Sequence, residues 1–115
     1  MPERYNNREL KYELVSHSEF NACIIASKFG ISLDGATLFT QSCPCSNCCK
    51  SLIQSGIRQV KTLKNCEEIW HNYSSKWKES AEITKLMLNE SGVEWIVCDI
   101  VCGDKILVGG KEYSI

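Results

Sequence analysis

Residues 44–48 read Pro44-Cys45-Ser46-Asn47-Cys48, so two cysteines stand three positions apart directly after a proline. Proline favours the first turn of a helix, because its φ is already near the helical value and its missing N–H needs no partner there. We therefore predict a helix over residues 45–55, ended by Gly56. At the start of such a helix both sulfurs point to one side, and the exposed N–H groups favour the thiolate form.

A second fragment, His17-Ser18-Glu19, begins another predicted helix over residues 18–29. His17 with Cys45 and Cys48 would make a Cys₂His ligand set for Zn²⁺. Three protein ligands leave the fourth tetrahedral position to water, as in catalytic zinc sites. Two thiolates cancel the charge of the metal, so the water needs a nearby base as well. Glu19 is the candidate for that general base.

The cysteines also allow other interpretations. A lone C-x-x-C is also found in redox pairs and in buried helices. Cys43 and Cys49 flank the pair and would allow a four-thiolate site, but Cys43 precedes the helix and Cys49 faces away from the other two cysteines. The Cys₂His set is therefore the favoured prediction.

The remaining segments alternate between strand and helix patterns, which predicts an α/β fold with a parallel sheet. Strands are expected at 36–41, 57–63 and 93–101, a polar loop through Trp70, Tyr73 and Trp77, a third helix at about 79–89, and a terminal hairpin of residues 105–108 and 111–114. In the third helix Ile83, Leu86 and Met87 are expected to form the apolar face, and in the first helix Phe20, Ile24 and Ile25.

The composition is that of one globular domain, residues 1–115, with a net charge of −1 and 43% hydrophobic residues. The nearly balanced charge gives no sign of the excess of basic residues that binds nucleic acid, so a polynucleotide partner is not expected. No apolar run is long enough to span a membrane, and the first residues are too polar for a signal peptide, so the cytoplasm is the expected compartment.

The eight cysteines are the compositional anomaly. In a reducing compartment, those outside the motif are expected to be packed or solvent-facing: Cys23, Cys66, Cys98 and Cys102. A second metal site using His71 with Cys66 stays open as an alternative. The aromatic side chains of residues 70–77 are expected to cover an edge of the core, with stacking on a base as the alternative.

The two fragments together form H-x-E…P-C-x-x-C, the signature of zinc deaminases. With Asn21-Ala22, residues 33–39, residues 51–57, and the later Trp77 and Ser80, the sequence resembles the cytidine and deoxycytidylate deaminase superfamily, most closely the deoxycytidylate (dCMP) deaminases of bacteria and phages. The resemblance covers nearly all of the chain and implies a three-layer α/β/α sandwich.

The resemblance also implies roles for individual residues. His17, Cys45 and Cys48 would hold zinc, Glu19 would shuttle protons, and the backbone around Ser18 and Cys43 would meet the polar edge of the pyrimidine. One departure from the family pattern is His-Ser-Glu where His-Ala-Glu is common. This change keeps both reacting groups.

The larger departure is at the N-terminal side, where family members carry a helix and a β-hairpin before the region that matches residues 2–11. We therefore expect an N-terminally truncated sheet with an open edge at residues 36–41, and association with a second copy or with a partner that supplies the hairpin. Arg4, Arg8, Lys11 and Tyr12 are candidates to substitute in phosphate binding.

Three functions follow as hypotheses. The first is hydrolytic deamination of a pyrimidine nucleotide, most simply dCMP to dUMP and ammonia. The second is deamination of another amino-heterocycle, such as a nucleoside, a riboflavin precursor or a base in nucleic acid. The third is a catalytically idle module that binds zinc or nucleotide.

Overall fold

The computed structural model describes residues 17–108 and 110–115. Its elements are α3 (Ser18–Lys28), β1 (Thr37–Phe39), α4 (Ser46–Gln54), β2 (Gln59–Leu63), α5 (Lys64–Tyr73), α6 (Ser75–Ser91), β3 (Glu94–Cys98), β4 (Lys105–Val108) and β5 (Lys111–Ser114). The predicted α/β alternation is therefore confirmed. The residues suggested for phosphate binding lie outside the described part of the chain: Arg4, Arg8, Lys11 and Tyr12.

The three strands β1, β2 and β3 form one parallel sheet in that order. Their register places Leu38, Val60 and Trp95 side by side across the sheet. Val60 is fully buried, and Leu38 and Trp95 pack against the core. This row of side chains therefore marks the face of the sheet that the helices cover.

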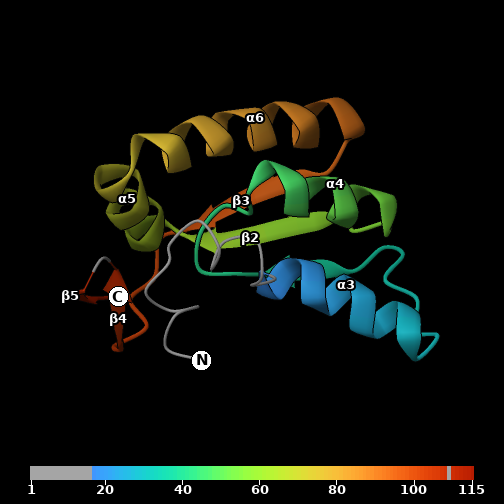
Figure 1. Cartoon of the computed structure of the whole chain (residues 1–115), viewed down its shortest axis with the longest axis horizontal. Coiled ribbons are helices and arrows are strands. Elements are labelled where there is room, and N and C mark those ends of the chain that lie inside the picture. The colour runs from blue at the N-terminus through green and yellow to red at the C-terminus, as the bar shows by residue number, and fades with distance from the viewer. Residues whose placement is uncertain (1–16, 109) are drawn as a thin grey trace, which may run out of the picture.

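Helix α4 lies between α3 and α6, and the three helices form a layer in front of the sheet in Figure 1. Between the helix layer and the sheet lies one cluster of buried side chains, and each of the three helices contributes to it. Its members are Cys23, Cys49, Leu52, Ile57, Val60 and Leu88. On the other side of the sheet Phe39 is 73% exposed. The described residues therefore form one helix layer, which covers one face of the sheet of the expected sandwich.

The region predicted as a loop, residues 64–77, is helical instead. Helix α5 begins directly after β2, and α6 begins at Ser75 rather than near Glu79. The missed signal is Ser74, whose Oγ accepts a hydrogen bond from the backbone N–H of Trp77 at 3.4 Å and so caps α6. A serine at this position satisfies one of the unpaired N–H groups of a helix start.

The predicted apolar faces of two helices were right only in part: Met87 of α6 packs against the core, but most of the other large residues named for these faces do not. Helix α6 buries Ala81, Thr84 and Leu88, whereas Ile83 is 52% and Leu86 56% exposed. Helix α3 likewise buries its small residues, Cys23 and Ala26, and exposes Ile24 and Ile25. Small side chains on the inner faces let these helices approach α4 and the sheet closely, which a count of large apolar residues does not detect.

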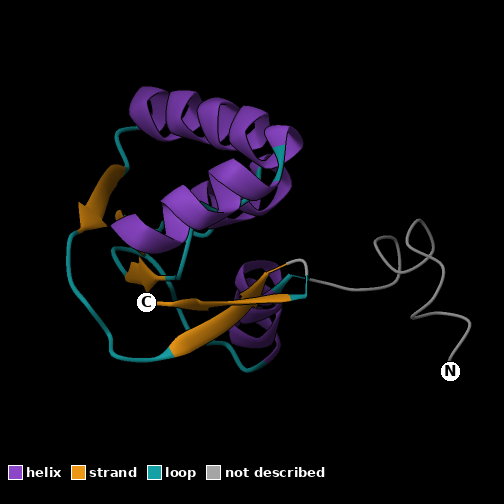
Figure 2. Cartoon of the chain, turned by 90° about the vertical axis from the view of Figure 1, so that its left-hand side faces the viewer, coloured by secondary structure: helices purple, strands orange, loops and turns teal. Residues whose placement is uncertain are grey.

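The terminal segments β4 and β5 form the predicted antiparallel hairpin. The hairpin lies beside α5 and apart from the three-stranded sheet (Figures 1 and 2). None of the described helices combines the length and the apolar character needed to cross a membrane.

Candidate metal centre

The two cysteines of the motif lie at the start of α4, as the proline predicts. Cys45 is the N-cap residue, and its Sγ accepts a hydrogen bond from the backbone N–H of Cys48 at 3.4 Å. The carbonyl of Cys45 accepts from the N–H of Cys49 at 2.9 Å, which completes the first helical turn. Both sulfurs are thereby held at the positive end of the helix dipole.

His17 reaches the same place from α3, of which it is the N-cap residue. Its backbone carbonyl accepts the N–H of Asn21 at 3.0 Å, so the first turn of α3 fixes its position. Nδ1 of His17 lies 3.3 Å from Sγ of Cys45 and 3.4 Å from Sγ of Cys48. Segments about 30 residues apart in sequence therefore bring three metal-ligating atoms within 4.8 Å of one another.

These distances fit a tetrahedral zinc ion. Zinc binds sulfur at about 2.3 Å and imidazole nitrogen at about 2.0 Å, which places such atoms about 3.5 Å apart in a tetrahedron. The observed S···N distances of 3.3 and 3.4 Å lie close to that value. His17, Cys45 and Cys48 are therefore geometrically able to hold Zn²⁺ with one position left open.

Burial also affects the ionisation of one of the two motif cysteines. Burial and the neighbouring thiol of Cys45 raise the pKa of Cys48 to about 12. Without a positive charge nearby, this thiol stays protonated at neutral pH. A divalent ion between the sulfurs reverses that balance, because a coordinated thiol is deprotonated outright.

Glu19 lies in the first turn of α3, two residues after His17. Its Oε1 accepts a hydrogen bond of 3.0 Å from Oγ1 of Thr40, and its Oε2 accepts one of 3.5 Å from Oγ of Ser18. Thr40 directly follows β1 and holds the carboxylate in place. The sequence does not reveal this role of Thr40, since only the fold brings the end of β1 to the start of α3.

The two cysteines that flank the motif are not part of this group. Cys49 is fully buried, and its Sγ is directed to the carbonyl of Thr84 at 3.9 Å. Cys43 is 2% exposed, and burial raises its pKa well above the usual range. Among residues 17–108 and 110–115, His17, Cys45 and Cys48 form the one cluster of three or more metal-ligating side chains. A four-thiolate site therefore finds no support in this geometry.

His71, the alternative ligand with Cys66, lies next to a carboxylate instead. Its Nε2 is 3.3 Å from Oε2 of Glu67, one helical turn away on α5. Glu67 is 6% exposed, and burial raises its pKa, while the backbone N–H of Cys43 and the hydroxyl of Thr62 act in the opposite direction. This buried carboxylate thus lies beneath the loop that leads to the metal-ligating cysteines.

Helix α6 holds this loop and the start of α4 from the other side. Oγ1 of Thr84 donates a 2.8 Å hydrogen bond to the carbonyl of Pro44, and Oγ of Ser80 accepts one of 3.0 Å from the N–H of Ser46. Thr84 is fully buried. Both contacts flank Cys45 in sequence, so α6 fixes the backbone on each side of a candidate ligand.

Replacing Thr84 by valine keeps the shape of the side chain and removes the donor to Pro44. We expect the free energy of unfolding to fall by about 1–3 kcal/mol, because a buried carbonyl loses its partner. Thr84→Ser, which keeps the hydroxyl, should retain more of the bond. Thermal denaturation with measured zinc content checks both variants. A valine variant as stable as the serine variant and with equal zinc affinity would contradict this role.

An open hollow of about 1400 Å³ adjoins the candidate metal centre. Its lining residues come from the start of α3, from the end of β1 and the loop after it, and from the α5–α6 corner: His17, Ser18, Glu19, Phe39, Thr40, Gln41, Ser42, Trp70, Tyr73, Ser74, Ser75, Lys76 and Trp77. Of the two predicted substrate contacts, Ser18 is in this lining and Cys43 is not. Their substrate contacts stay predictions.

Comparison with known proteins agrees with the motif. A family profile described as "Cytidine and deoxycytidylate deaminase zinc-binding region" matches residues 2–64, more than half of the chain. The chain is 33% identical to an "Uncharacterized deaminase in luxG 3'region" of Aliivibrio fischeri, over 84% of this chain and 62% of that protein.

The matches to two further relatives cover a smaller share of both chains. "ComE operon protein 2" of Bacillus subtilis (strain 168) is 40% identical over 59% of this chain and 35% of its own length. "Deoxycytidylate deaminase" of Homo sapiens is 32% identical over 76% of this chain and 44% of its own length. The chain therefore spans less than two thirds of the curated relatives that it matches here.

Proposed function

The chain belongs to the cytidine and deoxycytidylate deaminase family, and we propose that it deaminates dCMP hydrolytically to dUMP and ammonia. One observation carries this proposal. His17, one member of the Cys₂His group, and Glu19 line the same open hollow, so a metal ion held by that group and a base can act on the same bound substrate. A structural zinc site, closed by four ligands, needs neither the base nor the hollow.

In the proposed reaction His17, Cys45 and Cys48 hold the zinc ion, which when bound supplies a polarised and more acidic water molecule. Glu19, fixed by Thr40, takes a proton from the attacking water and delivers it to the ring nitrogen beside the reacting carbon. A C–O bond forms at the carbon that carries the amino group. Glu19 then takes the remaining proton from the newly bound oxygen and passes it to the amino nitrogen, the C–N bond breaks as the C=O bond forms, and ammonia leaves.

The choice of a nucleotide rests on the relatives and on the lining of the hollow. One relative is named a deoxycytidylate deaminase, and Lys76 in the lining offers a positive charge to a phosphate.

Exposed apolar side chains on α3 and β1, including Ile25 and Phe39, support the further proposal that the protein works as an oligomer.

Ammonia release from dCMP, cytidine and a cytosine-containing oligonucleotide tests the substrate. For the zinc-loaded protein we expect kcat/KM to be highest for dCMP, by about tenfold or more over cytidine, since a charge-assisted hydrogen bond to a phosphate contributes about 1.5–3 kcal/mol. Faster ammonia release from cytidine or from the oligonucleotide would contradict the choice of dCMP and identify that compound as the substrate instead. No release from any of the three, with zinc bound, would favour an idle module.

A further inference from the structure

Glu67 carries a buried carboxylate that the proposed reaction does not use. It lies in the first turn of α5 and is 6% exposed. Among the described residues, no donor meets either of its carboxylate oxygens in full hydrogen-bond geometry. Burying a carboxylate without partners is costly, so the groups that face Glu67 determine what it contributes to the fold.

The fold places the first turn of α5 beside the segment that leads to the metal ligands. The N–H of Leu63, at the end of β2, donates a 3.0 Å hydrogen bond to the carbonyl of Gln41. Helix α5 begins at the next residue, Lys64. From Gln41 the chain runs on to the candidate ligand Cys45. We call residues 41–45 the cysteine loop.

Two donors face the carboxylate of Glu67. One is the backbone N–H of Cys43 in the cysteine loop, and the other is the hydroxyl of Thr62 on β2. Burial raises the pKa of Glu67, and both donors act against that rise. The N–H of Cys43 makes no hydrogen bond to a carbonyl within the described part of the chain. Glu67 is therefore the acceptor available to it.

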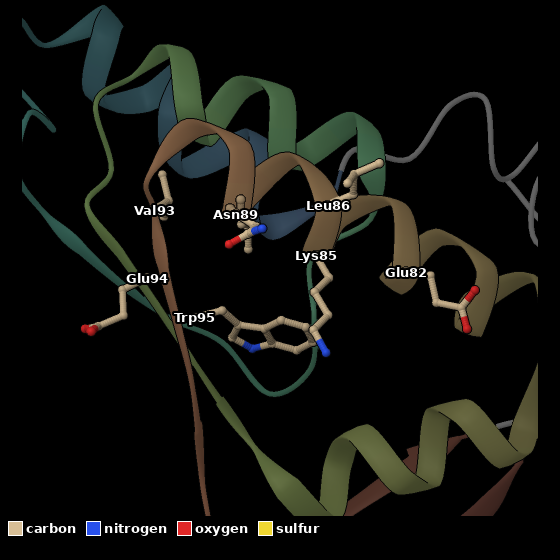
Figure 3. A pocket seen from close by; sticks show the side chains of 8 residues that line it. Glu82, Lys85, Leu86, Asn89, Val93, Glu94 and Trp95 are labelled. Carbon is tan, nitrogen blue, oxygen red and sulfur yellow. The ribbon is translucent and has the colours of Figure 1, made fainter.

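A second residue of the sheet orients the hydroxyl of Thr62. The indole N–H of Trp95 donates a 2.9 Å hydrogen bond to Oγ1 of Thr62, which is 1% exposed. Trp95 lies below α6, where it lines a separate hollow of about 590 Å³ (Figure 3). Because the hydroxyl oxygen accepts this bond, its own hydrogen stays free to point to the carboxylate of Glu67. Glu67 thus connects β2 with the cysteine loop.

The contacts from α6 do not hold the same point of the loop. Thr84 holds the carbonyl of Pro44, and Ser80 holds the N–H of Ser46. Neither of these two hydrogen bonds involves the backbone of Cys43. Glu67 therefore supports the loop before the proline, where the two contacts from α6 do not reach.

We propose that Glu67 is a positioning residue for the candidate metal centre, which anchors the cysteine loop through the N–H of Cys43 and so holds Cys45 beside the other two ligands. Its carboxylate is not itself one of the converging metal ligands. A loop that is fixed in advance spares metal binding the entropy of ordering it. The inference rests on the proposed function, because it concerns the metal ion which that function needs.

The zinc affinity of Glu67 variants, measured by competition with a chromogenic chelator, tests this role without any turnover. In Glu67→Leu the N–H of Cys43 loses its acceptor, and we expect zinc affinity to fall by about 10–100-fold, as is usual when a group that orients metal ligands is lost. Glu67→Gln keeps a side-chain oxygen for this N–H. It should lose only about fivefold or less, the difference between a charged and a neutral acceptor.

Glu68→Leu is the matched control for the leucine variant. Glu68 lies next to Glu67 near the start of α5 but is exposed, so its replacement removes the same charge from the helix start without touching the cysteine loop. Its zinc affinity should equal that of the unmodified protein. An equal loss of affinity in Glu68→Leu would show that only charge near the helix start matters and would overturn the anchor.

Thr62→Val keeps the test decisive if Glu67→Leu does not fold. Valine keeps the shape of the side chain and removes the hydroxyl that faces Glu67, and we expect zinc affinity to fall by about two- to tenfold. Unchanged zinc affinity in folded Glu67→Leu would overturn the anchor, even if the midpoint of thermal unfolding fell. Where the leucine variant does not fold, unchanged affinity in Thr62→Val would do the same.

The outcomes separate this inference from the proposed function. Zinc affinity that depends on Glu67, in a protein that releases no ammonia from dCMP, cytidine or the oligonucleotide, would support the anchor and overturn the function. Ammonia release from dCMP together with unchanged zinc affinity in folded Glu67→Leu would overturn the anchor and leave the function intact.

Discussion

Glu19→Gln protein is expected to bind zinc normally and to lose about 10²–10⁴-fold in kcat, the usual contribution of a general acid–base group. Glutamine keeps the size of the side chain and can still accept the hydrogen bond that Oγ1 of Thr40 donates to Glu19. It cannot accept a proton from the attacking water. Ammonia release under saturating dCMP, with zinc measured on the same sample, gives the two quantities needed.

Glu90→Gln is a matched control for this variant. Glu90 is exposed near the end of α6, far along the helix from the hollow, and the same chemical change there should leave kcat unaltered. If Glu19→Gln turned over at a rate near that of Glu90→Gln, another group would be the base.

Cys48→Ala protein is expected to lose its zinc. Only two of the three converging ligands remain, and a ligand set of one imidazole and one thiolate binds zinc far more weakly than the Cys₂His set. Because metal binding is coupled to folding, α4 and the loop before it should lose stability as well. Zinc content by elemental analysis and the midpoint of thermal unfolding measure both effects.

The neighbouring Cys49 provides the control on the same helix. It is fully buried in the core cluster, so Cys49→Ala should lower stability through lost packing and yet retain about one zinc per chain. Full zinc retention in Cys48→Ala, or loss of zinc in Cys49→Ala, would reverse the assignment of the two adjacent cysteines.

The ligand set could be predicted because its geometry is mostly local. Pro44 and Cys45 define the start of α4, and one helical turn then places Cys48 beside Cys45. His17 depends on a distant segment, but its position at the start of a helix made it a natural partner. The structure brings these three together, and their role as zinc ligands stays a prediction to be tested on the metal itself.

The supports of the site could not be predicted in the same way. The contact of Thr40 with Glu19 requires the end of β1 to meet the start of α3, and the contact of Thr84 with Pro44 requires α6 to pack on α4. Neither pair has a sequence spacing that local rules recognise. The buried threonine also lies on the face of α6 opposite to that expected from Ile83 and Leu86.

The α5–α6 corner was missed for a related reason. Residues 64–77 mix charged and aromatic residues and were therefore interpreted as a loop, although the apolar residues of α5 follow helical spacing. Helix α5 buries Cys66 and Glu67, and the start of α6 depends on the cap at Ser74. Propensity alone does not anticipate a buried glutamate. Because this corner carries three aromatic side chains, the error in local structure hid the inclusion of Trp70 and Trp77 in the lining of the hollow.

X-ray absorption at the zinc edge tests the central claim most directly, since it counts the sulfur atoms around the metal. A site held by His17, Cys45 and Cys48 with one open position predicts two sulfurs at about 2.3 Å and two nitrogen or oxygen atoms at about 2.0–2.1 Å. Four sulfurs at about 2.3 Å would instead show a closed structural site and contradict the account.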